Sequence, residues 1–354
     1  MKKNILIILL FSTQILFGVE LFTIDSNNKI IATQNPENTI GLLLNVTVYQ
    51  QILNNAEQQY NFNLPFFGQS LQFSLKKHNA IYNELQIISK TKRGNKLLDI
   101  KPNLLSYKMF YNGESVGIIS FVNGKILATF KMGGRQYELS KFKERYLLFE
   151  ATNSINSSDF ECGVQQVQPQ ALNNNPPLPL FTPKCIELAI VIDEYTRLTF
   201  ANDQEATNWA LAIIAGVSQL YEADINVSVQ VVDITIWNTT DPYATETGCG
   251  GILGVLGTYW QANNAAISRD LVHFMTKRGL GCGVAWLDVL CSTSNGYSVS
   301  ASLNSDTTYS FPNPTYTWNL EVTSHEIGHN VGSPHTHACG WAADPTTTPP
   351  FGGG

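Results

Sequence analysis

The sequence predicts an α+β protein: a mixed β-sheet with packed helices, preceded by a β-rich N-terminal half. Two observations support this class. Up to about residue 146, short segments alternate apolar and polar residues, as half-buried strands do. After Lys184, strand-like apolar runs alternate with segments of helical period, which indicates a mixed sheet carrying helices. The 354 residues suffice for two domains at roughly 150 residues each.

The N-terminal half reads as a series of β-hairpins. Alternating strands are expected at residues 71–75, 107–111, 116–122 and 126–130. Asn112-Gly113 and Asn123-Gly124 are dipeptides that favour tight hairpin turns. The region has no cluster of histidine, cysteine and carboxylate side chains, and His78 is expected to be packed or exposed without a role. This region is therefore expected to have a structural or regulatory role.

The chain begins like an exported protein. Residues 1–18 carry two lysines and then a short apolar stretch, which indicates a secretory signal peptide; an uncleaved membrane anchor is the alternative. No later stretch reaches about 20 apolar residues, so no further membrane span is expected. The net charge of −6 and the 14% charged residues give no basic stripe, which argues against nucleic acid as a partner.

Residues 151–183 differ from the sequence on either side. They are rich in Asn, Gln and Pro, as extended linkers that proteases cut easily are. The predicted division is therefore a signal peptide at 1–18, a β-rich segment at 19–150, a linker at 151–183 and a second domain at 184–354.

The second domain is expected to alternate strands and helices. Residues 186–192 form a nearly continuous apolar run typical of a buried strand. A helix capped by Asn202-Asp203 should follow, and then a strand alternating from Ile225 to Val231. Further expected elements are a glycine-rich loop at 248–257, a helix with the stripe Ile267, Leu271 and Phe274 that carries His273 and ends at Gly279, strands at 283–291 and 297–303, and a last helix from about Asn319. Trp237 and Trp260 are expected in the core.

All six cysteines follow the β-rich N-terminal segment. They are Cys162, Cys185, Cys249, Cys282, Cys291 and Cys339. In an exported protein some should form disulfides, although the spacing does not determine which.

The last predicted helix carries a zinc-ligand pattern. His325 and His329 are four residues apart, so one face of a helix presents both imidazoles to one metal ion. Gly332 suits a turn with positive φ, after which His335 can supply a third nitrogen. Three histidines leave one tetrahedral position for water, as in catalytic zinc sites, and Glu326 is placed to take a proton from that water. The alternative is a helix with two solvent-facing histidines and an unrelated glutamate. His337 could also reach substrate or metal, but the set of three zinc-binding histidines is complete without it.

The pattern HExxHxxGxxH resembles that of the metzincin metalloproteases. The chain is similar to their adamalysin (reprolysin) branch, in particular to secreted bacterial relatives, and residues 111–139 resemble the reprolysin propeptide. Residues 185–193 look like the first catalytic strand of that family. The segment Gly283, Val284, Ala285 and Trp286 resembles its edge strand, which implies pairing with extended polypeptide substrate.

Cys162-Gly163-Val164 looks like the cysteine switch of the same family, in which a propeptide thiolate fills the open zinc position. The alternative is a structural disulfide or an incidental linker cysteine. The family also carries a methionine turn after the third histidine, whereas all four methionines here precede the pattern. The catalytic domain is therefore expected to be incomplete, and Cys291 and Cys339 to lack partners.

These residues together predict a secreted zinc endopeptidase precursor that binds one catalytic Zn²⁺ and hydrolyses polypeptides. The runner-up is a non-catalytic zinc-binding or adhesion protein with the same fold, against which the intact Glu326 argues.

Overall fold

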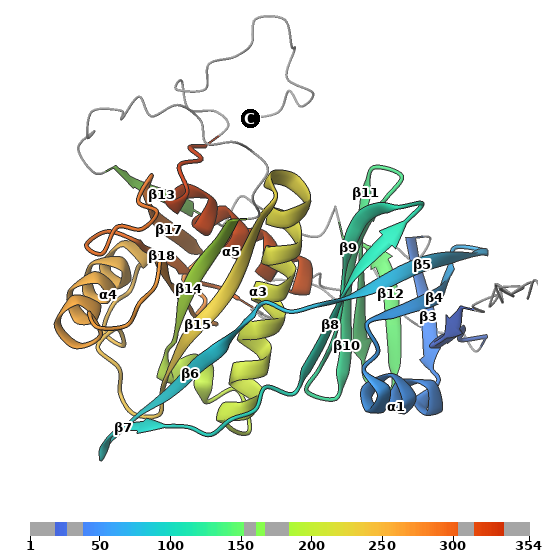
Figure 1. Ribbon diagram of the computed structural model, residues 1–354, viewed down its shortest axis with the longest axis horizontal. Coiled ribbons are helices and arrows are strands. Elements are labelled where there is room, and N and C mark those ends of the chain that lie inside the picture. The colour runs from blue at the N-terminus through green and yellow to red at the C-terminus, as the bar shows by residue number, and fades with distance from the viewer. Residues whose placement is uncertain (1–17, 27–37, 152–160, 167–183, 304–314, 336–354) are drawn as a thin grey trace, which may run out of the picture.

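The computed structural model describes residues 18–26, 38–151, 161–166, 184–303 and 315–335. These residues form two β-sheets, and helices α3 (Asp203–Ile225) and α5 (Thr315–Asn330) lie between the sheets and contact both (Figure 1). The predicted signal peptide lies outside the described residues apart from Gly18. Among the described residues, no helix combines the length and apolar character that a membrane span requires.

The first sheet has ten strands from the N-terminal half, in the order β1-β4-β5-β8-β9-β10-β11-β12-β3-β2. Their bounds are β1 Val19–Glu20, β2 Phe22–Ile24, β3 Thr39–Leu44, β4 Gln59–Phe66, β5 Gln69–His78, β8 Leu104–Tyr111, β9 Glu114–Val122, β10 Lys125–Met132, β11 Arg135–Phe142 and β12 Arg145–Glu150. Helix α1 (Val46–Asn55) packs on this sheet through Tyr49 and Ile52. The four predicted strands all lie inside these elements, and both Asn-Gly turns are confirmed by positive φ at Asn112 and Asn123.

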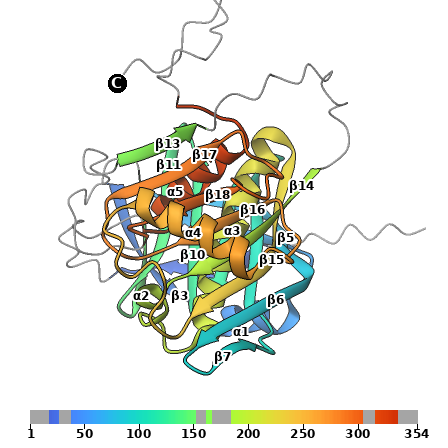
Figure 2. The same cartoon turned by 90° about the vertical axis from the view of Figure 1, so that its left-hand side faces the viewer.

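The second sheet has eight strands in the order β13-β17-β18-β16-β14-β15-β6-β7. Their bounds are β6 Ile81–Thr91, β7 Gly94–Leu97, β13 Glu161–Gln166, β14 Lys184–Ile192, β15 Val227–Trp237, β16 Leu271–Met275, β17 Cys282–Leu287 and β18 Tyr297–Ser300. Helices α2 (Glu194–Arg197) and α4 (Cys249–Asn263) complete the described elements. Figure 2 shows α4 over the face of this sheet opposite to α3.

Strand β14 is the centre of the second sheet, and its sequence explains its place there. Ile186, Leu188, Ile190 and Ile192 pack on the α3 side, whereas Ala189 and Val191 pack on the α4 side. Both faces are covered, so the apolar run is nearly continuous, as predicted. The predicted helix cap is also confirmed, since the Asn202 side chain accepts a hydrogen bond from the Glu205 N–H at 3.0 Å.

The secondary structure predicted between residues 248 and 279 is wrong, although Trp260 lies in the core as predicted. The expected glycine-rich loop forms most of helix α4, because burial of Ile252, Leu256 and Trp260 along one face outweighs the low helix propensity of glycine. The expected helix around Leu271 is instead strand β16, and His273 lies on that strand. A short run that is buried throughout shows neither helical nor strand periodicity, so its sequence is ambiguous.

Several predicted bounds also shift. The strand expected at 283–291 ends at Leu287, because Asp288 N–H and Val289 N–H turn to bond the carbonyls of His329 and Asn330 at the end of α5. The strand expected at 297–303 ends at Ser300, and Ile225 ends α3 rather than beginning a strand. Helix α5 begins at Thr315, one turn before the expected start.

Strands β6 and β7 come from the N-terminal half but belong to the second sheet, where β6 pairs in parallel with β15. Residues 161–166, expected as part of a linker, form strand β13 and pair in parallel with β17. The rest of that linker, residues 152–160 and 167–183, lies outside the described residues. The sequence boundaries at 150 and 184 are therefore not boundaries between the sheets.

Candidate active site

Helix α5 carries three of the predicted site residues on its last two turns, and the chain then reverses. Gly332 has φ 99°, and its N–H bonds the carbonyl of His329 at 3.0 Å. The Ser333 N–H bonds the carbonyl of Gly328 at 3.0 Å, which completes the cap. This turn brings His335 back beside His325 and His329, with the rings of His325 and His335 5.4 Å apart. His337 lies outside the described residues.

Four ligand atoms converge on one point. Cys162 Sγ lies 3.1 Å from His325 Nε2, 3.4 Å from His329 Nε2 and 3.1 Å from His335 Nε2. The Nε2 atoms of His325 and His329 are 3.0 Å apart, and all four ligand atoms lie within 4.8 Å of one another. A tetrahedral zinc ion with usual bond lengths separates its ligands by about 3.3–3.6 Å. The three sulfur–nitrogen distances lie within about 0.5 Å of this range, so the residues present fit a tetrahedral zinc ion.

The orientation of His329 is set by the turn after the helix. Its Nδ1 lies 2.6 Å from the carbonyl oxygen of Ser333, so Nδ1 donates its proton there. The lone pair of Nε2 is then directed toward the other ligands. A backbone carbonyl on the far nitrogen is a usual way to hold a metal-binding histidine in one tautomer.

Glu326 lies beside Cys162 Sγ and is fully buried. Its Oε1 accepts a hydrogen bond from the Cys162 thiol at 3.3 Å. Its Oε2 is buried without a hydrogen-bond partner among the described residues. The carboxylate does not share the ligand cluster, so it is free to exchange a proton with a molecule placed where Sγ now lies.

The predicted edge strand lies directly over Glu326. Gly283 opposes Cys162, and Val284 and Ala285 oppose Gly163 and Val164, along the parallel pair of β13 and β17. On its other side β17 pairs antiparallel with β18. The edge expected to receive substrate is thus already paired with a segment of the same chain.

Asn330 is a site residue that the sequence reasoning missed. Its Nδ2 donates to the carbonyls of Trp286, at 2.8 Å, and Tyr297, at 3.0 Å. These bonds tie the end of helix α5 to the end of β17 and the start of β18. Its spacing of four residues from Glu326 on the buried face of α5 was the available signal.

A disulfide joins Cys249, at the start of α4, to Cys282, at the start of β17. The sequence alone did not determine this pairing. The disulfide anchors the start of β17, the strand that carries Gly283. Cys162, Cys185 and Cys291 are free thiols, so Cys291 has no disulfide partner among the described residues, and Cys339 lies outside them.

Comparison with known proteins gives the family of this region. Residues 182–351 match the family described as metallo-peptidase family M12, of reprolysin type. This region is a metzincin-type zinc metallopeptidase domain of family M12. Its mixed sheet with packed helices is the α+β fold that the sequence predicted, and the family match confirms the predicted resemblance to the reprolysin branch.

Two known proteins are similar to parts of this chain. Human disintegrin and metalloproteinase domain-containing protein 9 is 24% identical over 154 residues, which are 42% of this chain and 18% of that protein. The chain thus spans less than a fifth of that relative's length. The crystal structure of metalloproteinase-II from Bacteroides fragilis covers 79% of this chain and 82% of its own, with a TM-score of 0.43 and 11% identity.

Burial governs the protonation of the M12 site groups. It lowers the pKa of His325 to about 4, with the neighbouring His329 and His335 adding to the effect, and it also lowers the pKa of His329. Burial raises the pKa of Glu326 to about 8, against the hydrogen bond from Cys162. The pKa of the Cys162 thiol is raised, first by burial and then by Glu326. Neutral imidazoles are ready to bind a cation, and a cation would itself favour the thiolate.

A cavity of about 850 Å³ opens beside the three histidines. Its walls are formed by the C-terminal end of α3 and the exposed side of α5. Leu220, Ile225 and Val331 supply apolar surface, and Asp224 and Glu321 supply carboxylates. The space is large enough for side chains of a bound polypeptide.

Proposed function

We propose that the protein is a secreted precursor of a zinc endopeptidase, kept latent by Cys162. The observation that carries the proposal is the position of Cys162 Sγ, 3.1–3.4 Å from the ligand nitrogens of all three histidines. A thiolate in that position fills the fourth tetrahedral place, which a catalytic zinc site leaves open. Cys162 also lies within hydrogen-bond reach of Glu326 Oε1, so it covers the proposed base.

The second support is the pairing of β13 with β17. An extended substrate binds an exposed strand edge through main-chain hydrogen bonds. Strand β13 occupies this edge at Gly283, Val284 and Ala285. One segment of the chain therefore blocks both the metal position and the substrate strand.

His325, His329 and His335 would hold the zinc ion, which polarises a carbonyl and makes water acidic when bound. With β13 displaced, the place of Sγ is open to water, and Glu326 Oε1 lies within reach to take a proton from it. The same carboxyl group then gives that proton to the leaving amine. Gly283 and Val284 offer backbone groups to align the substrate, and the disulfide at Cys282 anchors that strand.

Secretion is proposed on two grounds. Residues 1–18 have the composition of a signal peptide. The disulfide between Cys249 and Cys282 is typical of an oxidising compartment.

The proposal is tested by following hydrolysis of a denatured protein before and after treatment of the precursor with a thiol reagent. Hydrolysis should appear after treatment and vanish on addition of a zinc chelator. A precursor that binds one zinc ion yet shows chelator-insensitive hydrolysis would overturn the assignment of these residues.

A further inference from the structure

Residues 18–151 contact the M12 domain at several places outside the candidate zinc site. We propose that residues 18–151, here called the N-terminal body, remain bound to the M12 domain after the linker is cut. Activation then requires only that strand β13 leaves β17. This proposal rests on the proposed function, because only a latent precursor requires activation. The contacts that support it do not involve Cys162.

The first contact is a shared sheet. Strand β6 of the N-terminal body pairs with β15 in parallel, Gln86 opposite Asp233 and Lys90 opposite Trp237. Ile87 is 2% exposed and belongs to the same core cluster as Ile234. If the body left, β15 would become an open edge with unpaired N–H and C=O groups, and part of this core would be exposed to water.

Two buried ionisable side chains lie in the same strands. Lys90 of β6 and Asp233 of β15 are 3% and 1% exposed. Burial lowers the pKa of Lys90 and raises the pKa of Asp233 to about 7, and the opposite charge of the other residue works against each shift. Removing Lys90 with the body would take away a positive charge that favours the ionised form of Asp233.

The second contact is at the start of the zinc-ligand helix. Glu138 of β11 is fully buried, and its two oxygens accept hydrogen bonds from the N–H groups of Tyr316, at 3.3 Å, and Thr317, at 2.8 Å. The Thr129 and Thr317 hydroxyls bond each other at 2.8 Å. A carboxylate at a helix N-terminus satisfies otherwise unpaired N–H groups and complements the helix dipole. Helix α5 thus takes its cap from the N-terminal body.

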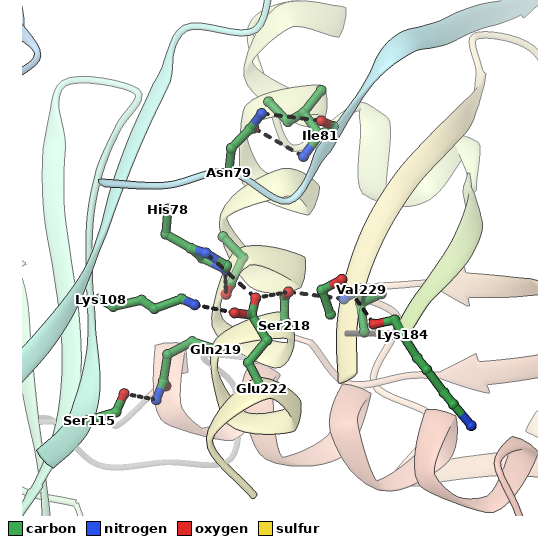
Figure 3. Close-up of polar contacts among 12 residues, drawn as sticks. His78, Asn79, Ile81, Lys108, Ser115, Lys184, Ser218, Gln219, Glu222 and Val229 are labelled. Atoms are coloured by element: carbon green, nitrogen blue, oxygen red, sulfur yellow. Dashed lines mark hydrogen bonds and ion pairs between the residues drawn. The ribbon is translucent and has the colours of Figure 1, made fainter. Parts of the chain in front are cut away.

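The third contact runs along α3, as Figure 3 shows. His78 Nε2 donates to the carbonyl of Ala215 at 3.1 Å, and Lys108 forms an ion pair with Glu222. Gln219 donates to the Ser115 hydroxyl at 3.2 Å. Ser218 connects this group to the sheet, since it donates to Glu222 and accepts from the Val229 N–H.

Strand β13 is held much less extensively. It is six residues long, and it lies at the edge of the sheet, so only β17 pairs with it. Among the described residues, the other contact of β13 is that of the Cys162 side chain with the histidines and Glu326. The two parts should therefore separate from the M12 domain under different conditions, β13 first.

The test uses the full chain with a recognition sequence for a specific protease placed within residues 167–183, in a Glu326→Gln background that prevents self-digestion. After complete cutting, the two fragments should co-elute from a gel-filtration column at micromolar concentration. The same should hold with Cys162→Ser. Separate elution of the fragments in the Glu326→Gln protein overturns the proposal. Co-elution that is lost with Cys162→Ser also overturns it, since β13 would then be the attachment, while the proposed latency would stand.

A matched pair of variants tests the helix cap. Glu138→Ala should release a labelled N-terminal fragment at least about tenfold faster than Glu144→Ala, which removes an exposed carboxylate from the turn between β11 and β12. Equal release rates would show that the Glu138 contact does not hold the body. If Glu138→Ala does not fold, Lys108→Met replaces it, since it removes the ion pair with Glu222 from a partly exposed position.

Discussion

Gly283 lies so close to Glu326 that no other residue fits at its position without moving the carboxylate. A Cβ atom on Gly283 would lie 2.2 Å from Glu326 Oε1 and 2.7 Å from its carboxyl carbon. The close approach puts the edge strand directly over the proposed base. It also explains a glycine at the start of β17, where the backbone itself has ordinary φ.

Gly283→Ala should preserve the fold and damage the chemistry. The Glu326 side chain can rotate away from the new methyl group, so the main cost is a misplaced base. A misplacement of about 1 Å can cost about 10²-fold in rate. We expect kcat/KM to fall by about that factor, with zinc content and Tm nearly unchanged. Gly254→Ala, where a Cβ meets nothing within 4 Å, is the control and should keep full activity.

Glu326→Gln should separate metal binding from catalysis. The amide keeps the shape of the side chain but cannot accept the proton, and the three histidines remain. We expect one zinc ion per chain by metal analysis and a loss of about 10²–10⁴-fold in kcat. Turnover close to that of the wild type would remove Glu326 from the mechanism.

Cys162→Ser should make the uncut precursor active. The hydroxyl is a much weaker zinc ligand than a thiolate, so water can enter the fourth position. The measurement is hydrolysis of a denatured protein by the uncut chain, together with the sulfur-to-metal absorption of the cobalt-substituted protein, which should be lost. Cys185→Ser, which alters another free thiol, should change neither. Mass spectrometry that finds Cys162 in a disulfide would contradict the switch.

Asn330→Ala should destabilise the site by loosening the helix from the edge strand. The change leaves the partly buried carbonyl of Trp286 and the buried carbonyl of Tyr297 without this donor. Each unsatisfied buried group costs about 1–3 kcal/mol, so we expect a loss of about 2–4 kcal/mol in the free energy of unfolding. Denaturant unfolding measures it. Asn263→Ala, on an exposed turn of α4, should change that free energy by less than about 0.5 kcal/mol.

His273 should make the protein less stable in acid. It is fully buried, and burial lowers its pKa from 6.5 to about 3. Between those values the unfolded chain binds a proton that the folded chain excludes, so stability is complete above pH 6.5 and falls as the pH falls, by about 1.4 kcal/mol per pH unit.

The matched variant is His273→Gln, which can still bond the Ser298 hydroxyl but cannot titrate. From pH 7.5 to 5, the wild type should lose about 2 kcal/mol more unfolding free energy than this variant. Urea titrations at the two pH values provide the comparison. Parallel losses in both proteins would show that His273 accepts a proton without unfolding.

Local spacing explains which expectations held. The Asn-Gly turns, the Asn202 cap and the alternation of β5, β8 and β9 depend on residues within a few positions of each other. The prediction of a helix around residues 271–275 failed because every residue there is buried, so no sequence period distinguishes strand from helix. Helix α4 was not predicted because its glycines obscured a buried face that only packing on β18 reveals, where a Cβ atom added to Gly257 would lie 3.4 Å from the Tyr297 ring.

The sequence by itself determined the metal-ligand pattern, because i, i+4 geometry and a glycine turn are local properties of the chain around His325, His329 and His335. Only the tertiary structure decided what lies against that pattern. Cys162 is 163 residues from His325, and Glu138 caps α5 from 178 residues away. Strand β6 enters the second sheet from the N-terminal half. Such contacts depend on how whole sheets pack. Cys162 was indicated only by its resemblance to a family motif, and Glu138 and β6 carry no local signal of their partners.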